Sequence, residues 1–158
     1  AGLYAGITPY FVTRCDDGMI GGGSDCSGEE ISDTWKDGDA NYTSVTTDLA
    51  DGQTNTANAV ATDSNSGAAG TQPHSAPEFC DNLVMHGNSD WYLPSRDEYD
   101  EMWTNRAAIG EFDTTGGNIR YWTSSEFAPG SAYYKRFDGG ASSTAIKVTR
   151  YRIRCARR

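Results

Sequence analysis

Residues 95–137, SRDEYDEMWTNRAAIGEFDTTGGNIRYWTSSEFAPGSAYYKRF, contain both secondary-structure patterns from which this fold is built. Ser95 and Glu98 have the S-x-x-E spacing of a capping box, in which each side chain satisfies a backbone N–H of the first helical turn. The next residues repeat at the i, i+3, i+4 and i+7 spacing of one helix face: Tyr99, Met102, Trp103 and Arg106. The stretch therefore predicts an amphipathic helix to about Ala108, with Gly110 as its end.

Strands are predicted on the C-terminal side of that helix, because β-prone residues there alternate with turn residues. The expected strands are IRYWTSS (119–125), SAYYKRF (131–137) and AIKVTRYRIRCA (145–156), with the turns APGS and DGGASS between them. Upstream, Ser75 and Glu78 repeat the capping-box spacing before Phe79 and Cys80, which predicts an earlier helix. We therefore expect an α+β fold with two helices packed on a mostly antiparallel, twisted sheet.

The first half of the chain is rich in turn residues. GLYAGITPYFVTR (2–14) predicts an opening strand, and 15–75 then holds a succession of Asp-Gly and Gly-Gly turns with one short helix over 54–62. This region has too few apolar residues for a core of its own. We expect residues 1–158 to form a single domain, in which 1–75 wraps as long ordered loops around the helices and strands of 76–158.

Composition and charge exclude several classes of protein. The 158 residues include 18 Gly, and only 37% are hydrophobic, which argues against a helical bundle. No apolar run approaches the roughly 20 residues of a membrane span, so no membrane insertion is expected. The net charge of −9 makes nucleic acid an unsuitable partner. Near the C-terminus, Arg150, Arg152 and Arg154 alternate with apolar residues, which predicts a solvated strand face.

The four cysteines indicate disulfides and an oxidising location, which is extracellular or on a virion surface. Cys15, Cys26, Cys80 and Cys155 are widely spaced, without the close pairs of a zinc site. Four cysteines allow three pairings. We favour Cys15–Cys26, which closes a glycine-rich loop, and Cys80–Cys155, which joins the earlier helix to the last strand. Spacing alone fixes neither pairing.

No catalytic or cofactor motif is evident in the sequence. Asp16, Asp17 and Asp25 are weak calcium candidates, because oxygen-rich irregular loops suit Ca²⁺, but no D-x-D-x-D-G loop is present. The acidic residues of 97–101 lie in the first turn of a predicted helix, where negative charge is favourable. Neither histidine lies in a recognisable nucleophile or base motif. We therefore expect no bound cofactor and no enzymatic activity.

Several motifs of the second half occur together in the order of a known family. They are DWYLPS, NRAAIG, YWTSSE, an aromatic strand ending in F-x-G-G, and RIRC. This pattern resembles the C-terminal domain of the collagen-like adhesin of Legionella and the phage and bacterial proteins that share it. The resemblance implies a C-type-lectin-like fold, in which a helix cysteine bonds to the last strand. The usual sugar-binding Glu-Pro-Asn and Trp-Asn-Asp motifs of that fold are absent, so calcium-mediated sugar binding is not expected.

The same pattern is similar to variable proteins diversified by retroelements, and this similarity implies that ligand contacts lie between YW-SS and RC. Within 131–137, period-2 alternation places Tyr133 and Phe137 on one face, which we expect to be the core. Tyr134 is then expected on the outward face. Adding the neighbouring turns gives the candidate ligand-binding residues Phe127, Pro129, Tyr134, Arg136, Asp138, Ser142, Ser143 and Thr144.

The function expected from the sequence is ligand binding without catalysis. The domain would be displayed on a virion fibre, a tail or a bacterial surface and would recognise a cell-surface glycan or protein. The alternative is a structural role, as a virion decoration or filament subunit whose surface mediates assembly. A single small binding domain gains avidity only when several copies are linked, so we expect a homotrimer or a repeated array.

Overall fold

The structure is a computed structural model that describes residues 11–13, 20–21, 26–27, 32–37, 46–64, 73–85, 87–110, 112–115 and 119–158. These residues form an α+β fold, as the sequence predicts. The helices are α1 (Gly52–Ser64), α2 (Ser75–Asp81), α3 (Arg96–Thr104) and α4 (Arg106–Ile109). The described residues thus contain four helices rather than two: α1 is a longer form of the short helix expected over 54–62, and α4 continues α3 after a break.

The central sheet has five strands, in the order β4 (Ser32–Thr34), β8 (Arg150–Arg152), β5 (Arg120–Ala128), β6 (Ser131–Arg136) and β7 (Ser142–Ile146). Only β5 and β8 run parallel, and the other neighbours are antiparallel. Two short antiparallel pairs lie outside this sheet. They are β1 (Phe11–Val12) with β9 (Ala156–Arg157), and β2 (Ile20–Gly21) with β3 (Cys26–Ser27).

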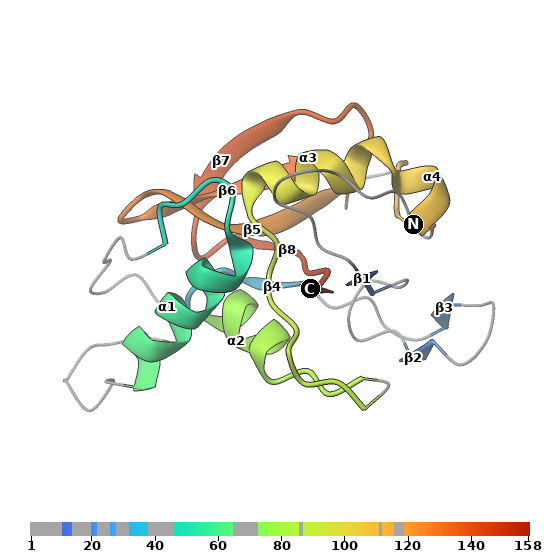
Figure 1. Ribbon diagram of the computed structural model, residues 1–158. Coiled ribbons are helices and arrows are strands. Elements are labelled where there is room, and N and C mark those ends of the chain that lie inside the picture. The colour runs from blue at the N-terminus through green and yellow to red at the C-terminus, as the bar shows by residue number, and fades with distance from the viewer. Residues whose placement is uncertain are drawn as a thin grey trace.

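Both faces of the sheet are covered by helices, and successive residues of β5 show this directly. Trp122 packs in a cluster with Ala76 and Cys80 of α2. Its neighbour Tyr121 packs in a second cluster with residues of α3. Figure 1 shows α1 and α2 together on one side of the sheet and α3 and α4 on the other. We call these sides the α2 face and the α3 face.

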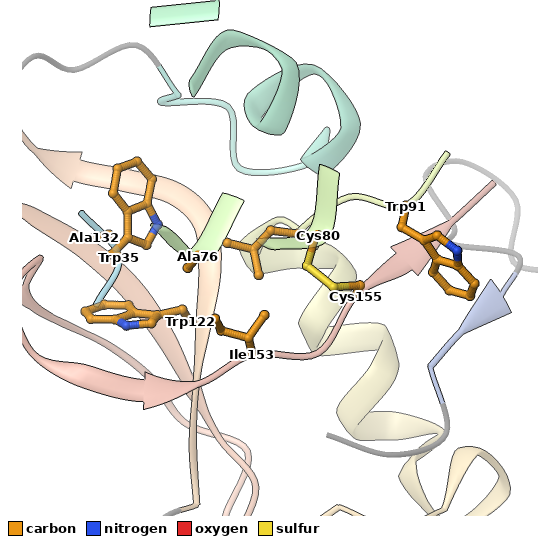
Figure 2. Close-up of a cluster of buried hydrophobic side chains, with 9 residues drawn as sticks. Trp35, Ala76, Cys80, Trp91, Trp122, Ala132, Ile153 and Cys155 are labelled. Carbon is orange, nitrogen blue, oxygen red and sulfur yellow. A yellow bond between two sulfur atoms is a disulfide. The ribbon is translucent and has the colours of Figure 1, made fainter. Parts of the chain in front are cut away.

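The cluster on the α2 face is centred on tryptophans and contains the predicted disulfide between Cys80 and Cys155 (Figure 2). This bond joins α2 to the segment before β9, with 5.5 Å between the two Cα atoms. Trp35, next to β4, is completely buried in the same cluster. The turn-rich first half therefore contributes Trp35 to a core that it shares with the second half.

The beginning and end of the helices follow the sequence in part. Ser95 is the N-cap of α3, and its side chain and that of Glu98 form the predicted capping box. The capping box predicted at Ser75 is wrong: His74 occupies the N-cap position, without a side-chain cap, and Ser75 is already helical. Asn105 separates α3 from α4, and Gly110, with φ of 84°, ends α4 as predicted.

The single strand predicted over 145–156 is interrupted, and its arginines are not all solvated. Residues 147–149 form a turn between β7 and β8, in which the Lys147 side chain is completely buried. Arg150 is exposed, but Arg152 and Arg154 are buried. Arg154 donates to the Gly110 carbonyl at 2.9 Å, because α4 and the segment after it cover this face.

Candidate functional site

The candidate ligand-binding residues lie on strands β5, β6 and β7, but the sheet divides them between its two faces. Tyr133 pairs with Thr144, and Lys135 pairs with Ser142, so these four side chains share the α3 face. Tyr134 pairs with Ser143 and Trp122, which places it on the α2 face. Because opposite faces cannot contact one ligand group together, the eight residues do not form one patch.

A surface that we call the hairpin patch lies on the α3 face, beyond the N-terminal end of α3. It consists of Phe127, Tyr133, Thr144 and Ile146. Phe127 is 60% exposed and Ile146 is 62% exposed. The Phe127 ring meets the Tyr133 ring edge to face, with 5.6 Å between centroids. Ile146 lies opposite Ser131 and is therefore the diagonal cross-strand neighbour of Tyr133. Two exposed apolar side chains thus flank a half-buried tyrosine.

Polar groups border the hairpin patch. Pro129 is exposed in the turn between β5 and β6, and Thr144 and Ser142 are exposed on the edge strand β7. The Arg96 guanidinium lies 5.5 Å from the Tyr133 ring centroid and pairs with Asp97 at 2.7 Å. The hydrogen bond with Asp97 raises the pKa of Arg96, so its charge is permanent. The patch therefore combines apolar rings, hydroxyls and one cation.

A buried ion pair lies beneath the β5–β6 hairpin, on the α2 face. Glu126 and Lys147 form this pair with both side chains completely buried, and the Lys147 amine lies 4.5 Å over the Trp35 ring. Burial lowers the pKa of Lys147, and the bond with Glu126 opposes that effect. Glu126 also accepts from the Thr46 backbone N–H at 2.7 Å. These bonds fix the strand on which Phe127 stands.

The N-terminus of α3, which carries Arg96, is fixed by a buried glutamate. One carboxylate oxygen of Glu98 accepts from the backbone N–H groups of Ser95 at 2.9 Å and Gly52 at 3.1 Å. The other accepts from the Tyr92 hydroxyl at 3.0 Å and from Arg158 at 3.2 Å. Burial, followed by the charge of Glu98, raises the pKa of Tyr92, so this hydroxyl remains a donor. The Glu98 carboxylate therefore joins the first residue of α1, the N-cap of α3 and the Arg158 side chain.

The face assignment made for 131–137 is partly wrong. Phe137 is buried as expected, in the cluster on the α3 face, but Tyr133 is only half-buried and belongs to the surface. Tyr134 is also half-buried: it packs against the tryptophan cluster and meets the Tyr151 ring with 4.8 Å between centroids. Each face carries its own core, so alternation could not identify one inward face.

The remaining candidates on the α2 face are polar. Arg136 pairs with Asp138, with its Nε 3.1 Å from one carboxylate oxygen, and this bond lowers the pKa of Asp138. Ser143 is exposed on β7. Sequence reasoning missed Ile146 and Arg96 on the α3 face. The alternation of side chains along β7 could have identified Ile146, since it points to the same face as Ser142 and Thr144. Only the fold brings Arg96 close to the Tyr133 ring.

A separate shallow groove of about 470 Å³ lies beside α2. It is lined by Asp37, Pro73, Ser75, Glu78, Phe79, Asn82, Leu83 and Val84. Val84 is 71% exposed at its rim. The lining of the groove includes two carboxylates, those of Asp37 and Glu78.

Some predicted sites lie outside the described residues. These include Cys15 and the calcium candidates Asp16, Asp17 and Asp25, so the Cys15–Cys26 pairing and the calcium site stay predictions. Within the described ranges, no three acidic, histidine or cysteine side chains gather as metal ligands. No helix in the same ranges has the length and apolar character needed to cross a membrane.

No protein-family model matches the chain, and no curated protein sequence matches it.

Proposed function

We propose that this chain is a non-enzymatic ligand-binding domain of the C-type-lectin-like class, displayed on a virion fibre, a tail or a bacterial surface. Its ligand is a cell-surface glycan or protein, and the hairpin patch is its contact surface. The observation that carries this proposal is the pair of exposed side chains Phe127 and Ile146 beside Tyr133. Exposed apolar groups gathered in this way are typical of interaction sites.

The mechanism follows from the rigidity of the hairpin. The buried pair of Glu126 and Lys147 holds β5 from below, so the strand that carries Phe127 is in place before a ligand arrives. Burying a phenylalanine side chain contributes roughly 1.5–3 kcal/mol. The patch is small, so a single domain binds weakly, and we propose that several linked copies, as a trimer or array, supply the avidity. The Cys80–Cys155 disulfide is consistent with a location outside the cytosol.

The test compares two exposed apolar side chains on different parts of the surface. Fluorescent wild-type protein, multimerised on streptavidin, is applied to a glycan array and to a panel of fixed bacterial and animal cells. Phe127→Ala should lower the affinity for whatever the wild type binds by about 5- to 150-fold, as the loss of a hot-spot aromatic does. Val84→Ala is the matched control and should bind normally.

Two results would contradict the receptor proposal. One is normal binding by Phe127→Ala with an unchanged melting temperature. The other is a wild-type multimer that binds neither the array nor any cell of the panel.

The alternative role in assembly is supported by the position of β7. This strand forms one edge of the sheet, pairing only with β6 among the described residues, and its Ile146 is 62% exposed. An open strand edge can pair with a second chain. Light scattering after size-exclusion chromatography separates the two roles. If the wild type is an oligomer and Ile146→Lys is a monomer that still binds cells, this edge serves assembly.

A further inference from the structure

Arg120 at the start of β5 forms, with two tyrosines of the α2 face, a group that we call the arginine–tyrosine cluster. The Arg120 guanidinium carbon lies 5.9 Å from the Tyr134 ring centroid and 5.8 Å from that of Tyr151. The two rings are 4.8 Å apart and tilted by 60°. Tyr151 also meets Trp122 of the tryptophan cluster, with 4.7 Å between centroids. Three neighbouring strands thus place one cation over two hydroxyl-bearing rings.

Within the part of the chain that the structure describes, the polar side-chain groups of this cluster have no hydrogen-bond partner. Among the described residues, no acceptor forms a hydrogen bond or ion pair with Arg120, although its Nε is buried from solvent. Across the same residues, neither the Tyr134 nor the Tyr151 hydroxyl makes a hydrogen bond. A buried donor without an acceptor is unfavourable, and a ligand that supplies the acceptor removes this cost. The cluster therefore offers a guanidinium and two phenol hydroxyls to a ligand.

The charged side chains around the cluster indicate the charge of its ligand. Arg136, the cross-strand partner of Arg120, is already paired with Asp138. Arg150 lies 3.5 Å from Asp33, the cross-strand partner of Tyr151. These two pairs are neutral, so the uncompensated charge among the described residues of this cluster and its cross-strand neighbours is that of Arg120. A single planar guanidinium suits a singly charged, forked acceptor such as a carboxylate.

The sheet also limits the kind of molecule that can carry this carboxylate. The cluster's strands β8, β5 and β6 each have a neighbour on both sides. Their backbone groups are therefore engaged, and an extended peptide cannot add to them as a new strand. Recognition must use side chains alone. Phenol hydroxyls beside a guanidinium can bind the hydroxyls and the carboxylate of one sugar ring.

We propose that the arginine–tyrosine cluster binds a carboxylated sugar, of the uronic or sialic acid type, through its carboxylate. Arg120 donates to the carboxylate, and the hydroxyls of Tyr134 and Tyr151 bond to the same group or to ring hydroxyls. This site lies on the opposite face of the sheet from the hairpin patch. It does not depend on the function proposed for Phe127.

The test uses the whole domain, with D-glucuronic acid and N-acetylneuraminic acid as probes in saturation-transfer NMR titrations. Both acids represent the proposed class, and saturable binding of at least one is expected. The methyl ester of glucuronic acid has the same ring without the charge, so it should bind at least 10-fold more weakly than glucuronate. Acetate supplies the carboxylate without a ring and should also bind at least 10-fold more weakly.

Variants assign the binding to the cluster. Arg120→Gln should weaken binding at least 10-fold, and Arg120→Lys should restore only part of it, because lysine lacks the planar fork. Tyr134→Phe with Tyr151→Phe removes both hydroxyls but keeps both rings. This double variant should weaken binding about 3- to 10-fold without unfolding the domain. Arg150→Gln is the matched control for loss of one positive charge and should bind normally.

Several outcomes would overturn the proposal. They are equal binding of the acid and its methyl ester, equal binding of acetate, and normal binding by folded Arg120→Gln or by the phenylalanine double variant. Tighter binding of a glutamate hexapeptide than of either sugar acid would assign the site to acidic peptides instead. Phe127→Ala should leave sugar-acid binding unchanged, so failure of this proposal and failure of the hairpin-patch proposal give different results.

Discussion

Acidification between pH 6.5 and pH 4 should destabilise the fold through one residue, His74. Its side chain is completely buried and meets the Trp35 ring edge to face, with 5.2 Å between centroids. Burial, followed by the nearby charge of Lys147, lowers the pKa of His74 from 6.5 to about 4. The charge of Lys36 acts in the same direction, whereas Glu126 and Glu78 oppose it.

The sign and size of the effect follow from proton linkage. Between pH 6.5 and 4 the unfolded chain binds a proton at His74 that the folded chain does not, so stability falls as pH falls. The difference of about 2.5 pKa units corresponds to roughly 3.4 kcal/mol once the pH is below the folded value. At pH 5 the loss is already about 2 kcal/mol, from the same relation. This is a large part of the 5–15 kcal/mol typical of a domain.

The assay is urea unfolding followed by tryptophan fluorescence at pH 7, 6, 5.5 and 5, without reductant. His74→Gln removes the titrating group, and its free energy of unfolding should fall by about 2 kcal/mol less than that of the wild type between pH 7 and 5. His86→Gln is the matched control, because it removes the other histidine, and it should behave as wild type. A His74→Gln variant with the same pH dependence as the wild type would refute the reasoning.

Three further predictions concern stability. Replacing Cys80 and Cys155 by alanine should lower the free energy of unfolding by about 4.5 kcal/mol, the value of the loop-entropy relation for a bond that spans 75 residues. Unfolding in guanidinium chloride measures this loss. Gly52→Ala should destabilise strongly, because the new Cβ would lie 2.6–2.7 Å from backbone atoms of the segment before α3. Gly139→Ala, where a Cβ meets nothing within 4 Å, is its control, and equal melting temperatures would contradict this contact. Tyr134→Ala should cost about 2–4 kcal/mol, because the ring packs against the tryptophan cluster, and an unchanged thermal transition would place it on the free surface instead.

Local signals in the sequence predicted much of the secondary structure. The capping box at Ser95 and the helix end at Gly110 depend on residues within one helical turn, so both can be recognised from the sequence alone. The spacing of Cys80 and Cys155 favoured the pairing that the structure contains. The α+β class and the two C-terminal hairpins followed from periodicity in the same way.

Only the tertiary structure decided which side chains are buried. Alternation separates Tyr133 from Tyr134, but it cannot say which face is covered, and in this sheet helices and clusters lie against both. Arg154 was predicted on a solvated strand face, yet it is buried and donates to the Gly110 carbonyl, which is distant in sequence. Lys147 is also buried, and Glu126 provides its partner. The exposure of Phe127 was expected from its turn. Its position beside Tyr133 and Ile146, and that of Arg120 over two tyrosines, depend on strand order and register, because these bring distant residues together.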